Sequence, residues 1–140
     1  MITEDYVSFK VAKLLQEKGF DEKCHSAWLY NPRKDNSEYF VEYLAKGTEN
    51  NTELGYFNEP DTDWAYSAPT LQRAMKWLRE VHKLHIAILW DCGAYIGKNC
   101  FYYHIDRIDN YEDKGYNKIG FDSYEQACEA AIMYCLTNLI

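Results

Sequence analysis

The sequence predicts an α+β fold, with three helices packed on an antiparallel sheet of about four strands as a two-layer sandwich. Apolar residues recur at helical spacing in three separate stretches, and two pairs of short alternating segments read as hairpins, which favour antiparallel pairing. The predicted order is α-β-β-loop-α-β-β-α. A chain of 140 residues fits one domain with a core of its own, so we expect a single domain over residues 1–140.

The first predicted helix begins after Ser8, because serine is a good N-cap residue. Its apolar row at helical spacing consists of Phe9, Ala12 and Leu15. Gly19 followed by Phe20 predicts the end of this helix, since glycine readily takes the left-handed conformation of a C-terminal stop.

Two strands are predicted next, over residues 26–30 and 38–45, with the turn-forming segment NPRKDN between them. Residues 46–66 then form a polar, turn-rich loop, and a loop of this length in a compact domain suggests a function or a short strand around 55–57. Between Asp35 and Asp63, eight acidic residues stand against Lys46 alone, so this segment carries a net charge of −7.

The second predicted helix lies in the most regular stretch, SAPTLQRAMKWLREVHKLHI at residues 67–86. Ser67 is expected to cap it, and Pro69 fits the first turn, where its missing N–H costs nothing. The predicted buried face comprises Leu71, Ala74, Met75, Leu78 and Val81. The positions that this face leaves free carry a basic row, consisting of Arg73, Lys76, Arg79 and Lys83. Helical periodicity accounts for the row as a solvated face, and a contact surface is the alternative.

The remaining chain predicts strands over 85–91 and 100–107, a polar turn region over 109–118 and a last helix from Ser123. Ser123 and Gln126 have the spacing of a capping box. The predicted buried stripe of the last helix comprises Tyr124, Ala127, Cys128, Ala131, Cys135 and Leu139. The five cysteines contain no C-x-x-C pair, and we interpret Cys128 and Cys135 as small core residues.

One set of residue types could bind a metal ion: His82, His85, His104 and Asp106. Two or more imidazoles with a carboxylate form a common ligand set for zinc. Against it, His82 falls on a helix and His85 at the start of a strand, so their side chains need not converge. We therefore predict no metal, no cofactor and no catalytic residue, with this set as the alternative.

The N-terminal residues MITEDYVSFK lack the basic start and apolar run of a signal peptide. No apolar run reaches the roughly 18 residues that a membrane span requires. We therefore expect a cytoplasmic protein that does not associate with membranes. A net charge of −7 argues against general affinity for nucleic acid, which depends on basic residues.

Three segments carry a resemblance to known sequences: YVSFKVAKLLQEKGF, SAPTLQRAMKWLREVHKLHI and SYEQACEAAIMYCLTNLI. In these segments the chain resembles a group of small uncharacterised proteins from gut bacteria and their phages and mobile elements. The resemblance implies an accessory protein of such an element. That group has no established activity, so the resemblance assigns no functional residue.

The leading hypothesis is a non-enzymatic protein-interaction protein that forms a small homo-oligomer and binds an unidentified protein partner. The predicted partner-binding residues are the acidic and aromatic residues of the loop: Glu49, Glu53, Tyr56, Phe57, Glu59, Asp61, Asp63 and Trp64. Electrostatic steering followed by aromatic anchoring would be the mechanism. The alternatives are a nucleic-acid-binding domain that uses the basic row and a small metal-dependent hydrolase around His82, His85 and His104.

Overall fold

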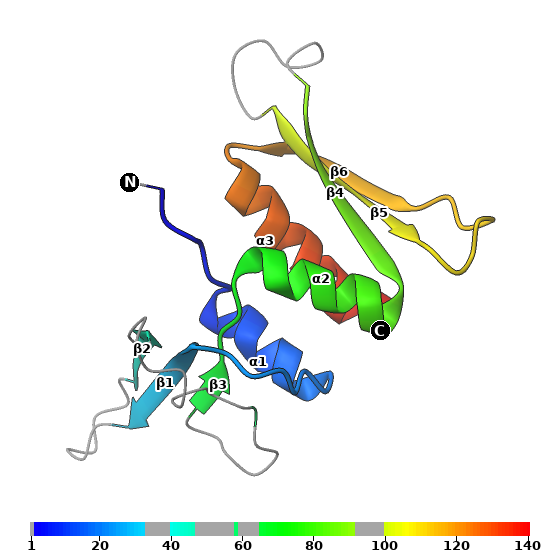
Figure 1. Cartoon of the computed structure of the whole chain (residues 1–140). Helices are drawn as coiled ribbons and strands as arrows, with labels where there is room; N and C mark the ends of the chain where they lie inside the picture. Colours follow the sequence, from blue (N-terminus) through cyan, green and yellow to red (C-terminus); the bar gives the residue numbers. More distant parts are fainter. Residues whose placement is uncertain (1, 33–39, 47–57, 59–64, 92–99) are drawn as a thin grey trace. The chain divides into compact units, whose positions relative to one another are not determined.

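The computed structural model describes residues 2–32, 40–46, 58, 65–91 and 100–140. They divide into two compact units, which we call the N-terminal unit (Tyr6–Thr70) and the C-terminal unit (Leu71–Ile140 with Met1–Asp5). The elements, drawn in Figure 1, are α1 (Phe9–Glu17), β1 (Ser26–Pro32), β2 (Phe40–Lys46), β3 (Ala65–Ser67), α2 (Leu71–His82), β4 (Leu84–Trp90), β5 (Phe101–Arg107), β6 (Tyr116–Phe121), α3 (Tyr124–Tyr134) and a final π-helical turn (Cys135–Leu139). Helices and antiparallel sheets confirm the α+β class.

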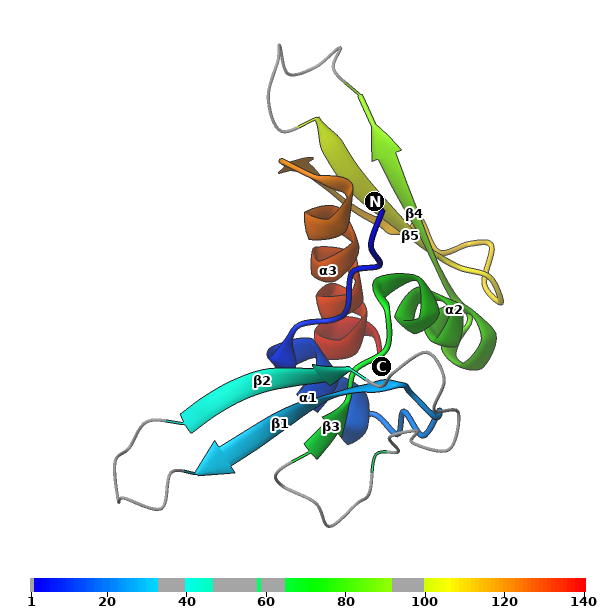
Figure 2. The ribbon, with the colours of Figure 1, turned by 60° about the vertical axis from the view of Figure 1, so that its left-hand side comes forward.

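The N-terminal unit contains a three-stranded antiparallel sheet with β1 between β2 and β3 (Figure 2). Helix α1 packs on β3, and three of its residues, Val11, Ala12 and Leu15, are buried. The Phe9 ring meets the Tyr66 ring edge-on at 5.4 Å, and the Trp28 indole N–H donates a 2.8 Å hydrogen bond to the carbonyl of Val7. Aromatic side chains thus join the helix, the sheet and the segment that precedes the helix.

The C-terminal unit contains the second three-stranded antiparallel sheet, a meander in the order β4-β5-β6. Helix α3 packs against all three strands, and α2 packs against β4 and α3. The strands contribute Leu84, Ile86, Tyr103 and Ile105 to the core, while α3 contributes Ala127, Cys128, Ala131 and Ile132. β4 and β5 therefore bury alternate residues, which leaves the other face of the sheet away from the helices.

The strands differ from the prediction in number and arrangement. The described residues contain six strands in two sheets, whereas the sequence predicted about four strands in one sheet. The two additional strands, β3 and β6, overlap the C-terminal ends of the predicted loop over 46–66 and of the predicted polar turn region over 109–118. The four predicted strands are present, with ends within two residues of the predicted ones. The prediction of a single domain over residues 1–140 stays a prediction.

The helix ends confirm the local signals at three positions. The Ser8 hydroxyl accepts a hydrogen bond from the backbone N–H of Val11, and the Ser123 hydroxyl accepts one from that of Gln126. Gly19 has φ +87°, and the N–H groups of Gly19 and Phe20 bond the carbonyls of Gln16 and Leu15, which is a Schellman motif. The Gln126 side chain bonds the N–H of Asp122 instead of Ser123, so the capping box is formed one residue early.

Three predictions about the helices were wrong. Ser67 does not cap α2, because it is the last residue of β3 and its N–H donates to the side chain of Asn58. Val81, predicted to be buried, is 56% exposed in the last turn of α2, just before the chain turns at Lys83 with φ +58°. In the last helix, Leu136 is buried instead of Leu139, because the π-helical turn shifts the apolar stripe, and Tyr124 lies at its exposed start.

A search for membrane-spanning segments over the described residues finds no helix with the length and apolar character needed to cross a bilayer.

Candidate protein-interaction surface

The face of the C-terminal sheet that points away from α2 and α3 is the main candidate surface, and we call it the open face. The register places on it His85, Ala87 and Leu89 from β4, Tyr102, His104 and Asp106 from β5, and Asn117 and Ile119 from β6. In β4 and β5 these positions alternate with the buried residues of the same strands. The open face is therefore built from side chains that the core does not use.

One end of the open face is apolar. Leu89 lies opposite Tyr102, and Tyr102 lies opposite Ile119, so the three side chains form a row that crosses the whole sheet. Leu89 is 43% exposed and Ile119 is 49% exposed, while Tyr102 between them is half-buried. A continuous row of large apolar side chains in water is typical of an interaction site, whereas exposed apolar residues scattered singly are ordinary.

The other end of the open face is polar. His104 Nε2 lies 2.9 Å from Asp106 Oδ1, and both side chains are partly exposed. His85 pairs with Asp106 across the β4–β5 ladder and is itself exposed. A partner protein would therefore meet hydrogen-bonding groups beside the apolar row.

Gly115 allows a close backbone approach at the polar end. It has φ +75°, and a Cβ at this position would lie 2.8 Å from the Ile105 carbonyl oxygen, 2.9 Å from Asp106 Oδ1 and 2.9 Å from His104 Cε1. Only glycine can adopt this φ and lie this close to the neighbouring atoms, because it has no Cβ. The backbone at Gly115 therefore lies directly against the His104–Asp106 pair.

The structure brings together only part of the alternative metal set. His104 and Asp106 are hydrogen-bonded, and His85 stands opposite Asp106, but the His82 ring packs against Trp77 of α2 at 4.6 Å between centroids. Within the described residues, no group of three or more histidine, cysteine or acidic side chains has a geometry that could hold a metal ion. The helix-to-strand change between His82 and His85 explains why their spacing in sequence does not bring them together.

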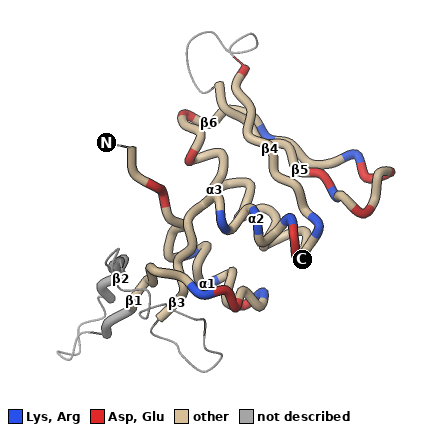
Figure 3. The backbone as a smooth tube through the Cα atoms, viewed as in Figure 1, with Lys and Arg blue, Asp and Glu red and all other residues tan. Residues whose placement is uncertain are grey.

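Arg73, Lys76 and Arg79 of the basic row lie on α2 as helical periodicity predicts, whereas Lys83 follows the end of the helix with φ +58°. Arg73, Lys76 and Lys83 are exposed and Arg79 is partly exposed. Figure 3 marks the basic positions along α2 in blue. The Lys83 ammonium donates to the Glu80 carbonyl at the C-terminal end of the helix, where a cation interacts favourably with the helix dipole. Arg79 lies 3.9 Å from the Glu80 carboxylate, at the limit of an ion pair. The row is a solvated face in this structure, and its role as a contact surface stays a prediction.

The predicted partner-binding residues of the acidic loop, Glu49 to Trp64, lie outside the described residues. Between residues 47 and 64, only Asn58 is described. The Asn58 amide donates a 2.8 Å hydrogen bond to the Phe20 carbonyl, and its oxygen accepts a 2.7 Å bond from the N–H of Ser67. Asn58 therefore ties the loop to the end of α1 and to β3. The short strand suggested around 55–57 also lies outside the described residues.

Four cysteines are described, and all four are buried: Cys24, Cys100, Cys128 and Cys135. Burial raises the pKa of Cys128 to about 11 and that of Cys135 to about 12, since the apolar surroundings disfavour the charged thiolate. A thiol that stays protonated at neutral pH is a poor nucleophile. This confirms the interpretation of Cys128 and Cys135 as core residues.

Comparisons with protein-family models, with curated proteins and with solved structures find no match to this chain. The candidate surface is therefore defined by the geometry alone.

Sequence reasoning did not find the open face. The segment CFYYHIDR alternates as a strand does, but the row Leu89–Tyr102–Ile119 depends on the register of three strands, and the predicted polar turn region over 109–118 covers the first half of β6. The signal that could have found it is the run YNKIGF at 116–121, which follows a glycine and precedes the cap at Ser123.

Proposed function

We propose that this chain is a non-enzymatic protein-interaction protein, and that the open face of the C-terminal sheet binds its partner. The row of Leu89, Tyr102 and Ile119 carries the proposal, because this is where large apolar side chains from three strands meet at the surface. Covering such a row removes apolar area from water, which is the main favourable term in protein association.

The chemistry of the open face suggests the complementary surface. A partner would present an apolar ridge to the row and a basic or amide hydrogen-bond donor to Asp106, whose side chain is half exposed. The contact with Asp106 would fix the orientation, since polar groups across an interface contribute more to specificity than to affinity.

The acidic loop belongs to the same proposal as a second contact. Its charge would attract a basic partner over a distance, and its aromatic residues would anchor the bound complex. Asn58 supports this role because it attaches the loop to buried parts of the N-terminal unit. The resemblance to proteins of gut bacteria and their phages suggests the bacterial cytoplasm as the setting.

The test is capture of bacterial proteins by tagged versions of the full chain. One variant carries Leu89→Gln with Ile119→Gln, and the matched control carries Lys10→Gln with Lys13→Gln, which changes two exposed residues of α1. A third variant changes Glu49, Glu53 and Glu59 to Gln. Circular dichroism establishes that each variant is folded.

We expect a protein that the wild type and the α1 control retain and that the open-face variant loses. Truncating an anchor residue of an interface costs more than about 1 kcal/mol. With both proposed anchors changed, retention should therefore fall by roughly tenfold or more. Retention unchanged by the open-face variant would refute the open face as the binding site. Loss with the loop variant alone would assign binding to the acidic loop instead.

A further inference from the structure

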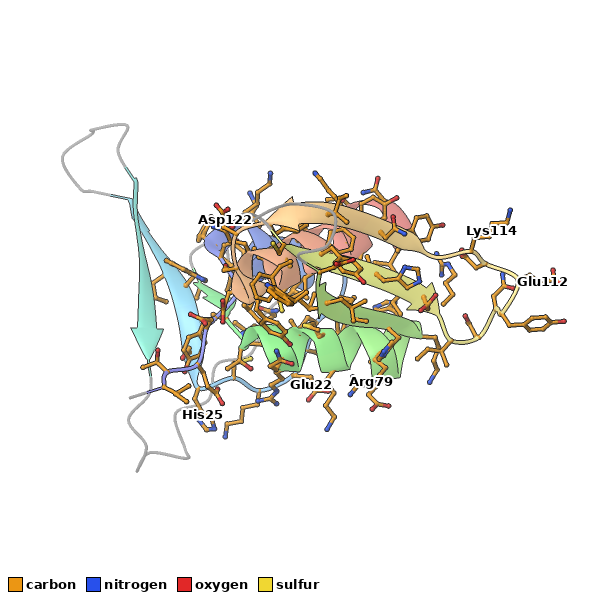
Figure 4. All side chains as sticks on the ribbon, turned by 90° about the horizontal axis from the view of Figure 1, so that it is seen from above. Glu22, His25, Arg79, Glu112, Lys114 and Asp122 are labelled. Carbon is orange, nitrogen blue, oxygen red and sulfur yellow. The ribbon has the colours of Figure 1, made fainter. Side chains whose placement is uncertain are left out.

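The connection between β5 and β6 forms a projecting tip, which we define as residues 108–114. Tyr111 is 94% exposed and Ile108 is 55% exposed, and Asp109 and Glu112 beside them are also exposed. In Figure 4, Glu112 and Lys114 lie at the outer end of the hairpin, and Arg79 lies on α2 in the body of the same unit. The tip thus presents an aromatic ring, two carboxylates and one ammonium group, that of Lys114, to the solvent.

Several bonds hold the tip in one conformation. The Asn110 side chain accepts a hydrogen bond from the N–H of Glu112, and the Asp113 side chain accepts one from the N–H of Gly115. Arg107 Nε lies 3.2 Å from Asp113 Oδ2, and the same guanidinium donates to the Leu139 carbonyl. Because the tip is ordered before any contact, binding through it would lose less conformational entropy than binding through a mobile loop.

The same unit carries the complementary surface. The outer face of α2 presents the basic row, with Lys76 and Arg79 near its centre, and the only acid on this helix is Glu80. The tip leaves the sheet at the C-terminal end of α2, where the N–H of Ile108 donates a 2.9 Å hydrogen bond to the Lys83 carbonyl. In Figure 4, Glu112 lies at the outer end of the tip, away from Arg79 on α2 of the same copy.

We infer that the tip of one copy docks on the basic face of α2 in a second copy of this chain. A two-fold arrangement then forms the contact twice, because each copy supplies one acidic tip and one basic helix. Asp109 and Glu112 face the cations of the partner helix, and the Tyr111 ring lies over an arginine or lysine side chain as a cation–π partner. This interface is separate from the open face, so either proposal can fail without the other.

The experiment measures association of the full chain by sedimentation velocity over a range of concentrations. The tip variant carries Asp109→Lys with Glu112→Lys, and the helix variant carries Lys76→Glu with Arg79→Glu. These side chains are at least partly exposed, so the variants should keep the wild-type circular dichroism spectrum. The wild type is expected to form dimers, and each variant alone is expected to be monomeric, because its tip and helix carry charges of the same sign.

Mixing the two variants is the decisive step. In the mixed dimer, the basic tip of one variant meets the acidic helix of the other, and the unchanged tip meets the unchanged helix, so dimers should return. A wild type that stays monomeric, variants that associate as the wild type does, or a mixture that stays monomeric would each overturn the inference. Tyr111→Ala, which alters no charge, should weaken the wild-type dimer about tenfold.

Discussion

Replacing Gly115 with alanine tests how closely the β5–β6 hairpin is packed against its own backbone. The added Cβ would lie 2.8 Å from the carbonyl oxygen of Ile105 and 2.9 Å from both Asp106 Oδ1 and His104 Cε1. The Ile105 carbonyl belongs to the central strand of the sheet, so it can move only if the β5–β6 ladder moves with it. The His104 and Asp106 contacts belong to a hydrogen-bonded pair, so relieving them disturbs the polar end of the open face.

Two effects lower the stability of this variant: the left-handed backbone conformation and the close contacts of the added Cβ. A left-handed φ costs an L-residue roughly 1–2 kcal/mol, offset in part by about 0.4–1 kcal/mol from the smaller entropy of the unfolded alanine chain. Overpacking against fixed neighbours typically costs a further 1–3 kcal/mol. We therefore expect Gly115→Ala to lower the free energy of unfolding by about 2–4 kcal/mol, measured by chemical denaturation followed by circular dichroism.

Gly120→Ala is the matched control, because Gly120 lies in the same hairpin with φ +99° and a Cβ there would meet nothing within 4 Å. It carries the conformational cost and the same unfolded-state offset without the contacts, so we expect a loss of no more than about 1.5 kcal/mol. The difference in the free energy of unfolding between the two variants therefore measures the cost of the close contacts at Gly115. If Gly115→Ala costs no more than Gly120→Ala, the hairpin is not packed as described and the reasoning is wrong.

Two further predictions concern the buried thiols and Asn58. Burial raises the pKa of Cys135 from 9.0 to about 12, so the unfolded chain loses this proton first as the pH rises. The contribution of Cys135 to stability is therefore complete below pH 9 and falls by about 1.4 kcal/mol per pH unit above it. Cys135→Ala should make the fall in stability between pH 9 and 11 shallower in denaturation experiments, and an unchanged slope would count against a buried neutral thiol. Asn58→Ala removes a donor to the Phe20 carbonyl and an acceptor for the Ser67 N–H, so we expect a loss of about 2–4 kcal/mol. Asn117→Ala, at an exposed position of β6, should change stability by less than about 0.5 kcal/mol, and equal losses in the two variants would refute the role of Asn58.

Signals that act within a few residues were the reliable ones in this chain. The serine caps at Ser8 and Ser123 and the glycine stop at Gly19 depend on bonds between neighbours in the sequence, and all three are present. Ser67 looked the same in sequence, yet its N–H bonds Asn58 and its backbone pairs with β1. A local signal therefore fails where residues from elsewhere in the chain form hydrogen bonds with the same backbone groups.

The candidate surface required more than local signals. The amino-acid pattern was enough to establish the α+β class and most of each buried helix face, because side-chain periodicity indicates which residues are buried. The pairing of Leu89 with Tyr102 and of Tyr102 with Ile119 is a matter of strand register, as is the approach of Gly115 to His104 and Asp106. Register joins residues that are far apart in the chain, and it is selected by the packing of whole strands against α2 and α3, so it emerges only when the sheet is assembled.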